Sequence, residues 1–332
     1  MASRVDDRPA FDAEIVQGFC ESGRERIITG VAVRFKLAAT FFFTFSFFPF
    51  IIPYMSNHRR PIGVFDSGVG GLSVLRAMRE LMPEEPVIYF GDQGHVPYGP
   101  RPLEQVRDFS EAITRFLIGQ DARLIVVACN TASAAALHYL RDKFPEISFV
   151  GMEPAVKPAA EYTRSGTVGV LATPATFQGA LYASVVERFA NGVEVLQDTC
   201  LGLVGQIEQG NLDGGETRLI LETALRPMLD RGIDTVVLGC THYPFVIPLV
   251  EQIVGENVRV IDPAPAVAKQ AKRLLTADGM KNAVGDRAQV RFYTSGDGSL
   301  LASLLPRLLG EGGRVELVTW LDDQHIKLVD HI

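Results

Sequence analysis

Two short stretches of this chain share one pattern. An apolar strand ends at a cysteine, a threonine comes soon after it, and a helix follows. The first is Val127-Ala128-Cys129-Asn130-Thr131, and the second is Leu238-Gly239-Cys240-Thr241-His242. The aliphatic runs at 123–127 and 235–238 are typical of strands in a parallel sheet that is covered on both faces. Because the same local structure is expected twice, we predict that the two thiols face each other across one small substrate.

Strand and helix patterns alternate from Pro61 onward, which is typical of parallel sheets with right-handed crossovers. Strands are predicted at 61–65, 85–91, 123–127, 147–151, 167–172, 193–196, 235–238, 258–262 and 290–294. We predict an α/β fold with two similar domains, each with a mainly parallel central sheet, and an active site in the cleft between them. Expected boundaries at Glu153-Pro154 and Asp262-Pro263 give a first domain of 61–153 plus 263–332 and a second of 154–262.

Residues 1–60 do not share this alternation and are interpreted as an N-terminal extension. The uncharged, phenylalanine-rich segment 37–55 is short for a membrane span and contains Pro49 and Pro53. Three interpretations stay open: a membrane anchor, a signal segment, and a true translation start at Met55. We favour the start at Met55, because 55–60 leads directly into the first predicted strand.

Composition excludes several classes of function. A formal charge of −7 over 332 residues provides no basic footprint for nucleic acid. Four cysteines in a chain of this length are not a disulfide framework and suit a reducing cytoplasm. Because no Cys-x-x-Cys or His-x-x-x-His pair occurs, we expect no metal site.

The matched cysteines favour one reaction in particular. Inversion of a carbon stereocentre needs a base that removes the proton and an acid that delivers a proton to the opposite face. A thiolate and a thiol can divide these roles, and a helix N-terminus can lower a thiol pKa from its usual value of about 8.5. A buried cysteine can also be a plain apolar residue. No lysine occurs in these motifs, so pyridoxal is disfavoured and we expect no cofactor.

Polar residues at the other strand ends are candidate ligand groups, because ligands bind beyond the carboxyl ends of parallel strands. Asn130, Thr131 and Thr241 offer donors to a substrate carboxylate, although such residues are also common helix caps. Asp66 and Ser67 precede the glycine-rich turn 68–71. Its spacing misses the dinucleotide-binding pattern G-x-G-x-x-G, so we expect a tight turn beside a small ligand.

Four more polar residues are weaker candidates. His242 is placed to activate Cys240, and Asp92 and Glu153 are placed to assist proton movement. Thr176 lies in the turn 173–176 after a predicted strand. Each of these residues is also explained as a capping or surface group.

Five motifs taken together resemble those of bacterial glutamate racemases, over the chain from about Pro61 to its end. They are the segment 62–72, Pro97-Tyr98-Gly99, Cys129-Asn130-Thr131-Ala132, Glu153-Pro154 and Gly239-Cys240-Thr241-His242-Tyr243-Pro244. The last motif is more similar to glutamate racemases than to their aspartate-racemase relatives. The resemblance implies two α/β domains, no cofactor, glutamate as substrate, and D-glutamate supplied to peptidoglycan synthesis.

The resemblance also assigns roles by position. It implies that Cys129 acts on the D-isomer and Cys240 on the L-isomer, with Asp66, Asp92, Glu153 and His242 assisting proton transfer. The implied substrate-binding positions are Asp66, Ser67, Pro97, Tyr98, Gly99, Asn130, Thr131, Thr241 and His242, and we add Thr176. The loop 91–97 departs from the pattern usual in the family, Asp-Thr-Ala/Lys-Arg, which leaves the shape of this loop open.

Several alternatives remain at this point. An aspartate or hydantoin racemase would use the same scaffold, and a regulatory gyrase-binding relative would have lost or supplemented catalysis. Retention of both Cys129 and Cys240 argues against lost catalysis. We expect a homodimer, and the resemblance implies that a peptidoglycan precursor can act as an activator. No membrane partner is expected unless 37–55 is a real anchor.

Overall fold

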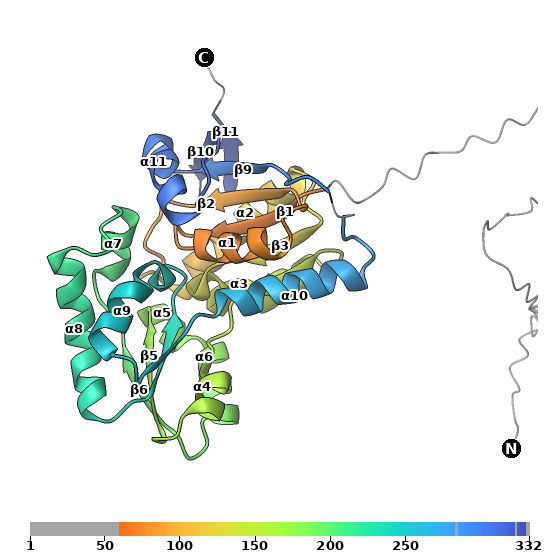
Figure 1. Cartoon of the computed structure of the whole chain (residues 1–332). Coiled ribbons are helices and arrows are strands. Elements are labelled where there is room, and N and C mark those ends of the chain that lie inside the picture. Colours follow the sequence, from red (N-terminus) through yellow and green to blue (C-terminus); the bar gives the residue numbers. More distant parts are fainter. Residues whose placement is uncertain (1–59, 283–284, 323, 330–332) are drawn as a thin grey trace, which may run out of the picture. The chain divides into compact units, whose positions relative to one another are not determined.

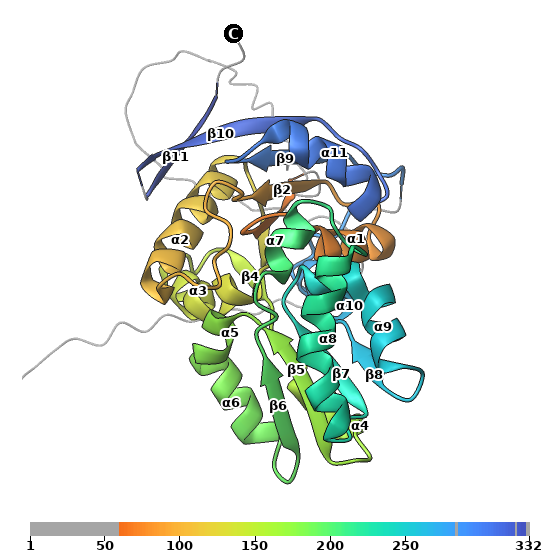
Figure 2. The ribbon, with the colours of Figure 1, turned by 90° about the vertical axis from the view of Figure 1, so that its left-hand side faces the viewer.

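The computed structural model describes residues 60–282, 285–322 and 324–329. The expectations about the N-terminal extension, the segment 37–55 and a start at Met55 therefore lie outside the described residues. In the part that is described, no helix combines the length and the apolar character needed to cross a membrane. The strands of this part form two sheets, as Figures 1 and 2 show.

The larger sheet has seven strands in the described residues, in the order β11-β10-β9-β2-β1-β3-β4. Every pair is parallel except β10–β11. The strands are β1 (Ile62–Asp66), β2 (Val87–Gly91), β3 (Leu124–Val127), β4 (Ser148–Gly151), β9 (Val290–Thr294), β10 (Val315–Asp322) and β11 (His325–Leu328).

Alternate side chains of the central strands bury on opposite faces of this sheet, so both faces need helices. Ile62 and Val64 pack with α1 (Leu72–Leu81), α10 (Ala264–Ala277) and α11 (Gly298–Leu308). Phe65 packs on the other face with α2 (Leu103–Gly119) and α3 (Asn130–Lys143). The fully buried runs of β1 and β3 are therefore explained by two helical layers.

The smaller sheet has four parallel strands in the order β6-β5-β7-β8. They are β5 (Thr167–Ala172), β6 (Glu194–Asp198), β7 (Thr235–Gly239) and β8 (Arg259–Ile261). The helices of this region are α4 (Val156–Tyr162), α5 (Pro174–Gln178), α6 (Ala180–Phe189), α7 (Leu203–Glu208), α8 (Gly215–Asp230) and α9 (Ile247–Val254), with the 3₁₀ helix η2 (Tyr243–Val246). We call the two sheets with their helices the large and the small lobe.

The predicted α/β class with mainly parallel sheets is confirmed. After β8 the chain returns to the large lobe, where β9 pairs with β2. The exact domain limits stay a prediction. The hairpin β10–β11 and helix α4 were not predicted, and after β5 the chain forms two short helices, α5 and α6, with Gly179 between them.

Candidate active site

Both cysteines lie where the strand order of their own sheet reverses, which is where open α/β sheets bind ligands. In the large lobe β1 lies between β2 and β3, so Asp66 and Cys129 follow neighbouring strands. In the small lobe β5 lies between β6 and β7, and Ala172 pairs with Gly239 immediately before Cys240. The two lobes thus repeat one arrangement.

One small pocket has walls from both lobes and includes both thiols. Its lining residues from the large lobe are Ser67, Pro97, Tyr98, Gly99, Cys129, Asn130 and Thr131, and those from the small lobe are Thr173, Val204, Cys240, Thr241 and His242. The cavity measures about 20 Å³, which is room for about one water molecule. An amino acid therefore enters only when the walls move apart.

Cys129 has a neutral to acidic environment. It caps α3, where the Ala132 N–H lies 3.5 Å from Sγ, and the Ser67 hydroxyl lies 4.0 Å from Sγ. The cap alone would lower the thiol pKa, as predicted. Burial, and then the neighbouring Asp66 carboxylate, instead raise the pKa of Cys129 well above its usual value. In this closed pocket Cys129 is therefore a protonated thiol.

Cys240 has a basic neighbour. Its Sγ lies 3.7 Å from Nδ1 of His242, and Nε2 of His242 lies 2.6 Å from Oε1 of Glu208. Burial would lower the pKa of His242, but its contacts with Cys240 and Glu208 raise the pKa well above the usual value. Burial would raise the pKa of Glu208, but His242, the Val69 N–H and Gln93 lower it. The geometry thus pairs Cys240 with an imidazolium that Glu208 holds.

The glycine-rich turn 68–71 permits this close approach of the lobes. A Cβ added at Gly68 would lie 1.9 Å from Oε1 of Glu208, and one at Gly70 would lie 2.3 Å from Nδ1 of His242. The Val69 N–H donates a 2.7 Å hydrogen bond to Glu208. The turn therefore lets the backbone approach the Glu208–His242 pair, whereas the sequence predicted a small ligand beside it, which stays a prediction.

Several buried polar atoms at the pocket have no hydrogen-bond partner. They are both side-chain polar atoms of Asn130, which lines the pocket, and Oδ1 of Asp66, which lies beside Cys129 but does not line the pocket. The other oxygen of Asp66 accepts a 2.7 Å hydrogen bond from the Gly71 N–H. Burial raises the pKa of Asp66, whereas His242 and Cys129 lower it. Because buried polar groups are nearly always paired, unpaired atoms at one pocket indicate a polar ligand.

Threonine hydroxyls connect the two lobes on the other side of the pocket. Oγ1 of Thr131 lies 2.8 Å from Oγ1 of Thr173, which lies 2.9 Å from Oγ1 of Thr176. Thr131 and Thr173 line the pocket, whereas Thr176 lies behind them. The Thr241 carbonyl accepts a 2.8 Å hydrogen bond from Ser73 of α1, which fixes the backbone after Cys240.

Asp92 supports the pocket wall and does not line it. Oδ2 accepts a 2.6 Å hydrogen bond from the Tyr98 hydroxyl, while Oδ1 accepts hydrogen bonds from Ser295 and the Trp320 indole at 2.6 and 2.8 Å. His95 completes the set at 3.0 Å from Oδ2. With both oxygens occupied, Asp92 positions Tyr98, which does line the pocket together with Pro97 and Gly99.

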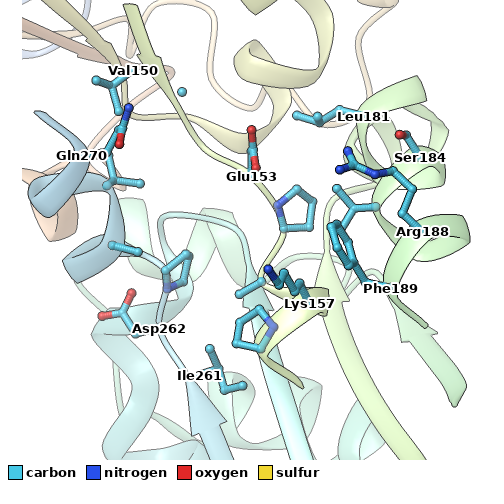
Figure 3. A pocket seen from close by; sticks show the side chains of 18 of the residues that line it. Val150, Glu153, Lys157, Leu181, Ser184, Arg188, Phe189, Ile261, Asp262 and Gln270 are labelled. Carbon is cyan, nitrogen blue, oxygen red and sulfur yellow. The ribbon is translucent and has the colours of Figure 1, made fainter. Parts of the chain in front are cut away.

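Glu153 is not brought to the pocket. It lines a separate cavity of about 630 Å³ beside the two connections between the lobes, shown in Figure 3 with Lys157, Arg188 and Asp262. It follows β4, the edge strand of its sheet, so its strand end lies away from the point where the strand order reverses. The structure thus provides no contact by which Glu153 would assist proton transfer at the thiols.

Glu208 is the main site residue that sequence reasoning missed, with Val204 and Thr173 of the pocket wall. Glu208 ends the short helix α7 and follows no strand, so its place beside His242 arises only from the tertiary fold. The one local signal is a carboxylate next to the buried Ile207 in an otherwise uncharged helix. Among the described residues, no group of three His, Cys, Asp or Glu side chains could hold a metal ion.

Comparison with known proteins identifies similar sequences and folds. Residues 62–271 match the family model described as Asp/Glu/Hydantoin racemase. The glutamate racemase of Ectopseudomonas mendocina is 48% identical over 263 residues, which cover 79% of this chain and 100% of that protein. The glutamate racemase of Roseiflexus sp. is 49% identical over 258 residues, which cover 77% and 95%.

Solved structures show the same similarity. A glutamate racemase isoform of Bacillus anthracis has a TM-score of 0.71 at 31% identity and covers 81% of this chain and 99% of that chain. Escherichia coli glutamate racemase, in complex with L-glutamate and the activator UDP-MurNAc-Ala, has a TM-score of 0.68 at 33% identity and covers 78% and 97%.

Proposed function

The chain belongs to the Asp/Glu/Hydantoin racemase family, and from this premise we propose that it interconverts L-glutamate and D-glutamate by a two-thiol mechanism without a cofactor. The observation that carries the mechanism is one pocket lined by Cys129 from the large lobe and Cys240 from the small lobe. The identity of the substrate is supported by glutamate racemases among the relatives.

The two environments divide the work of proton transfer. With L-glutamate, the Cys240 thiolate, stabilised by the His242 imidazolium, accepts the α-proton as the Cα–H bond breaks. The Cys129 thiol then delivers its own proton to the opposite face of the planar carbanion. The product leaves with one Cα–H bond re-formed, with Cys240 as a thiol and with Cys129 as a thiolate. The reverse reaction therefore starts from Cys129. Positioned acid–base groups of this kind typically contribute about 10²- to 10⁴-fold in rate.

The unpaired polar atoms provide the substrate contacts. We assign the α-ammonium to Oδ1 of Asp66 and a carboxylate to the Asn130 amide, with the hydroxyls of Thr131 and Thr241 beside it. An ammonium group next to Asp66 reduces the negative charge that raises the pKa of Cys129. Substrate binding would thereby prepare Cys129 for thiolate formation in the D-to-L direction.

A second part of the proposal concerns regulation. The Escherichia coli relative was determined with an activator, UDP-MurNAc-Ala, and we propose that an anionic precursor of this class also activates this chain. The cavity of Figure 3 is the proposed site, because residues of both inter-lobe connections line it and Arg141, Lys157 and Arg188 supply cations for a diphosphate. The proposal includes a cytoplasmic homodimer and D-glutamate supply to peptidoglycan.

Circular dichroism of L- or D-glutamate with the purified protein and no added cofactor tests the reaction. The expected result is that the circular dichroism signal of either enantiomer decays to the same racemic end point. The signal of L-aspartate should decay much more slowly under the same conditions. Faster turnover of aspartate or of a hydantoin would favour the alternative racemases. A glutamate signal that does not decay would contradict the proposal and leave the regulatory gyrase-binding alternative.

A further inference from the structure

Gln93 lies in the loop after β2 whose sequence departs from the usual family pattern. Its Nε2 donates a 3.1 Å hydrogen bond to Oε2 of Glu208, and its Oε1 accepts a 2.9 Å hydrogen bond from the Thr294 hydroxyl. Gln93 belongs to the large lobe and Glu208 to the small lobe. The side chain therefore spans from the returning strand β9 to the acid that contacts His242.

The surrounding contacts agree with the orientation in which the NH₂ end of the Gln93 amide faces Glu208. Oγ1 of the fully buried Thr294 accepts a 3.1 Å hydrogen bond from the Gly296 N–H, so its own hydrogen is available for Oε1 of Gln93. With Oε1 on the Thr294 hydroxyl, the NH₂ group of Gln93 faces the Glu208 carboxylate, which suits an ionised acid. A Cβ added at Gly296 would lie 2.7 Å from Cβ of Gln93, so the loop and the returning segment are closely packed.

The Glu208 carboxylate thus receives two hydrogen bonds from the large lobe, from Gln93 and from the Val69 N–H. Its third contact is His242, the neighbour of Cys240. The charged or titratable groups that influence this pair are Asp66 and Tyr89 of the large lobe and Cys240 of the small lobe. None of these three groups donates a hydrogen bond to Glu208. Among the described residues, Gln93 is therefore the side chain by which the large lobe donates to Glu208.

We propose that Gln93 is a positioning residue that holds the Glu208 carboxylate on the His242 ring when the lobes close. This inference rests on the proposed racemase function and adds to it a residue that touches neither the substrate nor a thiol. The hydrogen bond from Gln93 favours the ionised form of Glu208, and an ionised Glu208 keeps His242 protonated beside Cys240. Lobe closure is thereby coupled to the charge state of the Cys240 half of the site.

Two substitutions of Gln93 separate positioning from simple support of the fold. Gln93→Met keeps length and volume but removes the donor, so we expect kcat/KM for glutamate to fall about tenfold or more, as for loss of a hydrogen bond to a charged group. The loss should be largest at alkaline pH, because a His242 ring that Glu208 holds less firmly loses its proton at lower pH, and the ratio to wild type should recover as pH falls. Gln209→Met, at an exposed residue of the surface cavity that Gln93 and Glu208 also line, is the matched control and should behave as wild type.

Gln93→Glu tests the same contact with a carboxyl group in place of the amide donor. The introduced carboxyl group can still donate to Glu208 while it is protonated, whereas its ionised form places two carboxylates together. The ratio of this variant to wild type should therefore fall as pH rises from 5.5 to 8.5, roughly the range over which such a carboxyl pair loses its shared proton. A loss that grows with pH in both Gln93 variants, but not in Gln209→Met, is not expected from a residue that only supports the loop.

A measurement without turnover distinguishes this inference from the proposed function. In protein labelled with ¹⁵N-histidine, with His242 assigned by His242→Gln, we expect the His242 ring in Gln93→Met to titrate at lower pH than in wild type. Equal His242 titration in the two proteins would overturn the role of Gln93, even if wild type racemises glutamate. If His242 titrates at lower pH in Gln93→Met but the wild-type chain does not racemise glutamate, the positioning role of Gln93 is supported and the proposed function is contradicted.

Discussion

The regions around Cys129 and Cys240 have the same backbone plan and opposite electrostatics. Each cysteine follows a central parallel strand where the strand order of its sheet reverses. Cys129 caps the α-helix α3 and lies beside a carboxylate, whereas Cys240 precedes the 3₁₀ helix η2 and lies beside an imidazole. The repeated plan places two thiols at one pocket, and the different neighbours give them different electrostatic environments.

This difference indicates how a nearly symmetric reaction uses an asymmetric site. Burial and Asp66 raise the pKa of Cys129, while His242 and Glu208 form a charged pair at Cys240. In the proposed mechanism, the charged His242–Glu208 pair would stabilise a thiolate at Cys240 that removes the proton from L-glutamate. The D-to-L direction needs the substrate ammonium to change the charge around Cys129. The following substitutions test each side of this comparison.

The largest effect is expected from removal of either thiol. Cys129→Ala and Cys240→Ala should each reduce racemisation by about 10³-fold or more, since each removes one of the two acid–base groups. Both variants should still bind glutamate, measured by calorimetry. In D₂O, Cys129→Ala should exchange the α-hydrogen of L-glutamate only, and Cys240→Ala that of D-glutamate only.

Cys200→Ala is the matched control for both thiols. Cys200 is also buried and also free, but it does not line the pocket. It should keep wild-type turnover. Substantial racemisation by either active-site variant, or exchange of both enantiomers by one of them, would contradict the assignment of one thiol to each face.

A smaller but still large loss is expected when the lobes cannot approach. In Gly70→Ala the new Cβ would lie 2.3 Å from His242 and 2.7 Å from Oγ1 of Thr241. Displacement of catalytic groups by about 1 Å can cost about 100-fold in rate, and we expect kcat/KM to fall by that order. Gly119→Ala, where a Cβ meets nothing within 4 Å, should be neutral, and equal losses in the two variants would count against steric displacement at the site.

The central fold was predictable because its strands are buried on both faces. The runs of β1, β3, β5 and β7 are fully buried, so their apolar sequences are continuous and easy to recognise. The hairpin β10–β11 is mostly half-buried or exposed and includes charged residues, which weakens its strand signal. Helix α4 is short and contains Pro158, so its periodicity is also weak.

The same physics explains which site residues sequence analysis could find. Residues immediately after a central strand, such as Cys129, Asn130 and Cys240, have a position set by the strand itself. Glu153 also follows a strand, but the sequence does not reveal that β4 lies at the sheet edge. Glu208 needs the contact between lobes to reach His242, and no local pattern encodes that contact.

An intermediate effect is expected from Glu208→Gln, which removes the charge of the pair at Cys240. Turnover should fall roughly tenfold, and the free energy of unfolding at pH 6 by roughly 2 kcal/mol, as for a hydrogen bond to a charged group. Glu208 has a lowered pKa, so its contribution is present above the unfolded value of about 4.3 and is lost as pH falls through the folded value.

His242 has a raised pKa, so its contribution is fully present below about 6.5 and is lost as pH rises through the folded value. The stability difference between wild type and Glu208→Gln should therefore be largest between these limits. Chemical denaturation at a series of pH values from about 3 to about 10 measures this stability difference, because that range includes the titrations of both groups. A difference that does not change with pH would show that Glu208 and His242 are not a charged pair, and Glu187→Gln, at an exposed residue of α6, is the control.

The smallest effect is expected from Trp320→Phe on the Cys129 side, where the C-terminal hairpin reaches the pocket wall through Asp92 and through the Phe109 ring, which a phenylalanine would still contact. The substitution removes one donor at 2.8 Å from Oδ1, while Ser295 and Tyr98 keep theirs. A single neutral donor is worth about 1 kcal/mol, so KM for glutamate should rise about fivefold with kcat nearly unchanged. The substitution should loosen the position of Tyr98 without removing a group that transfers protons. A fall in kcat as large as that of Glu208→Gln would instead make Asp92 a participant in proton transfer.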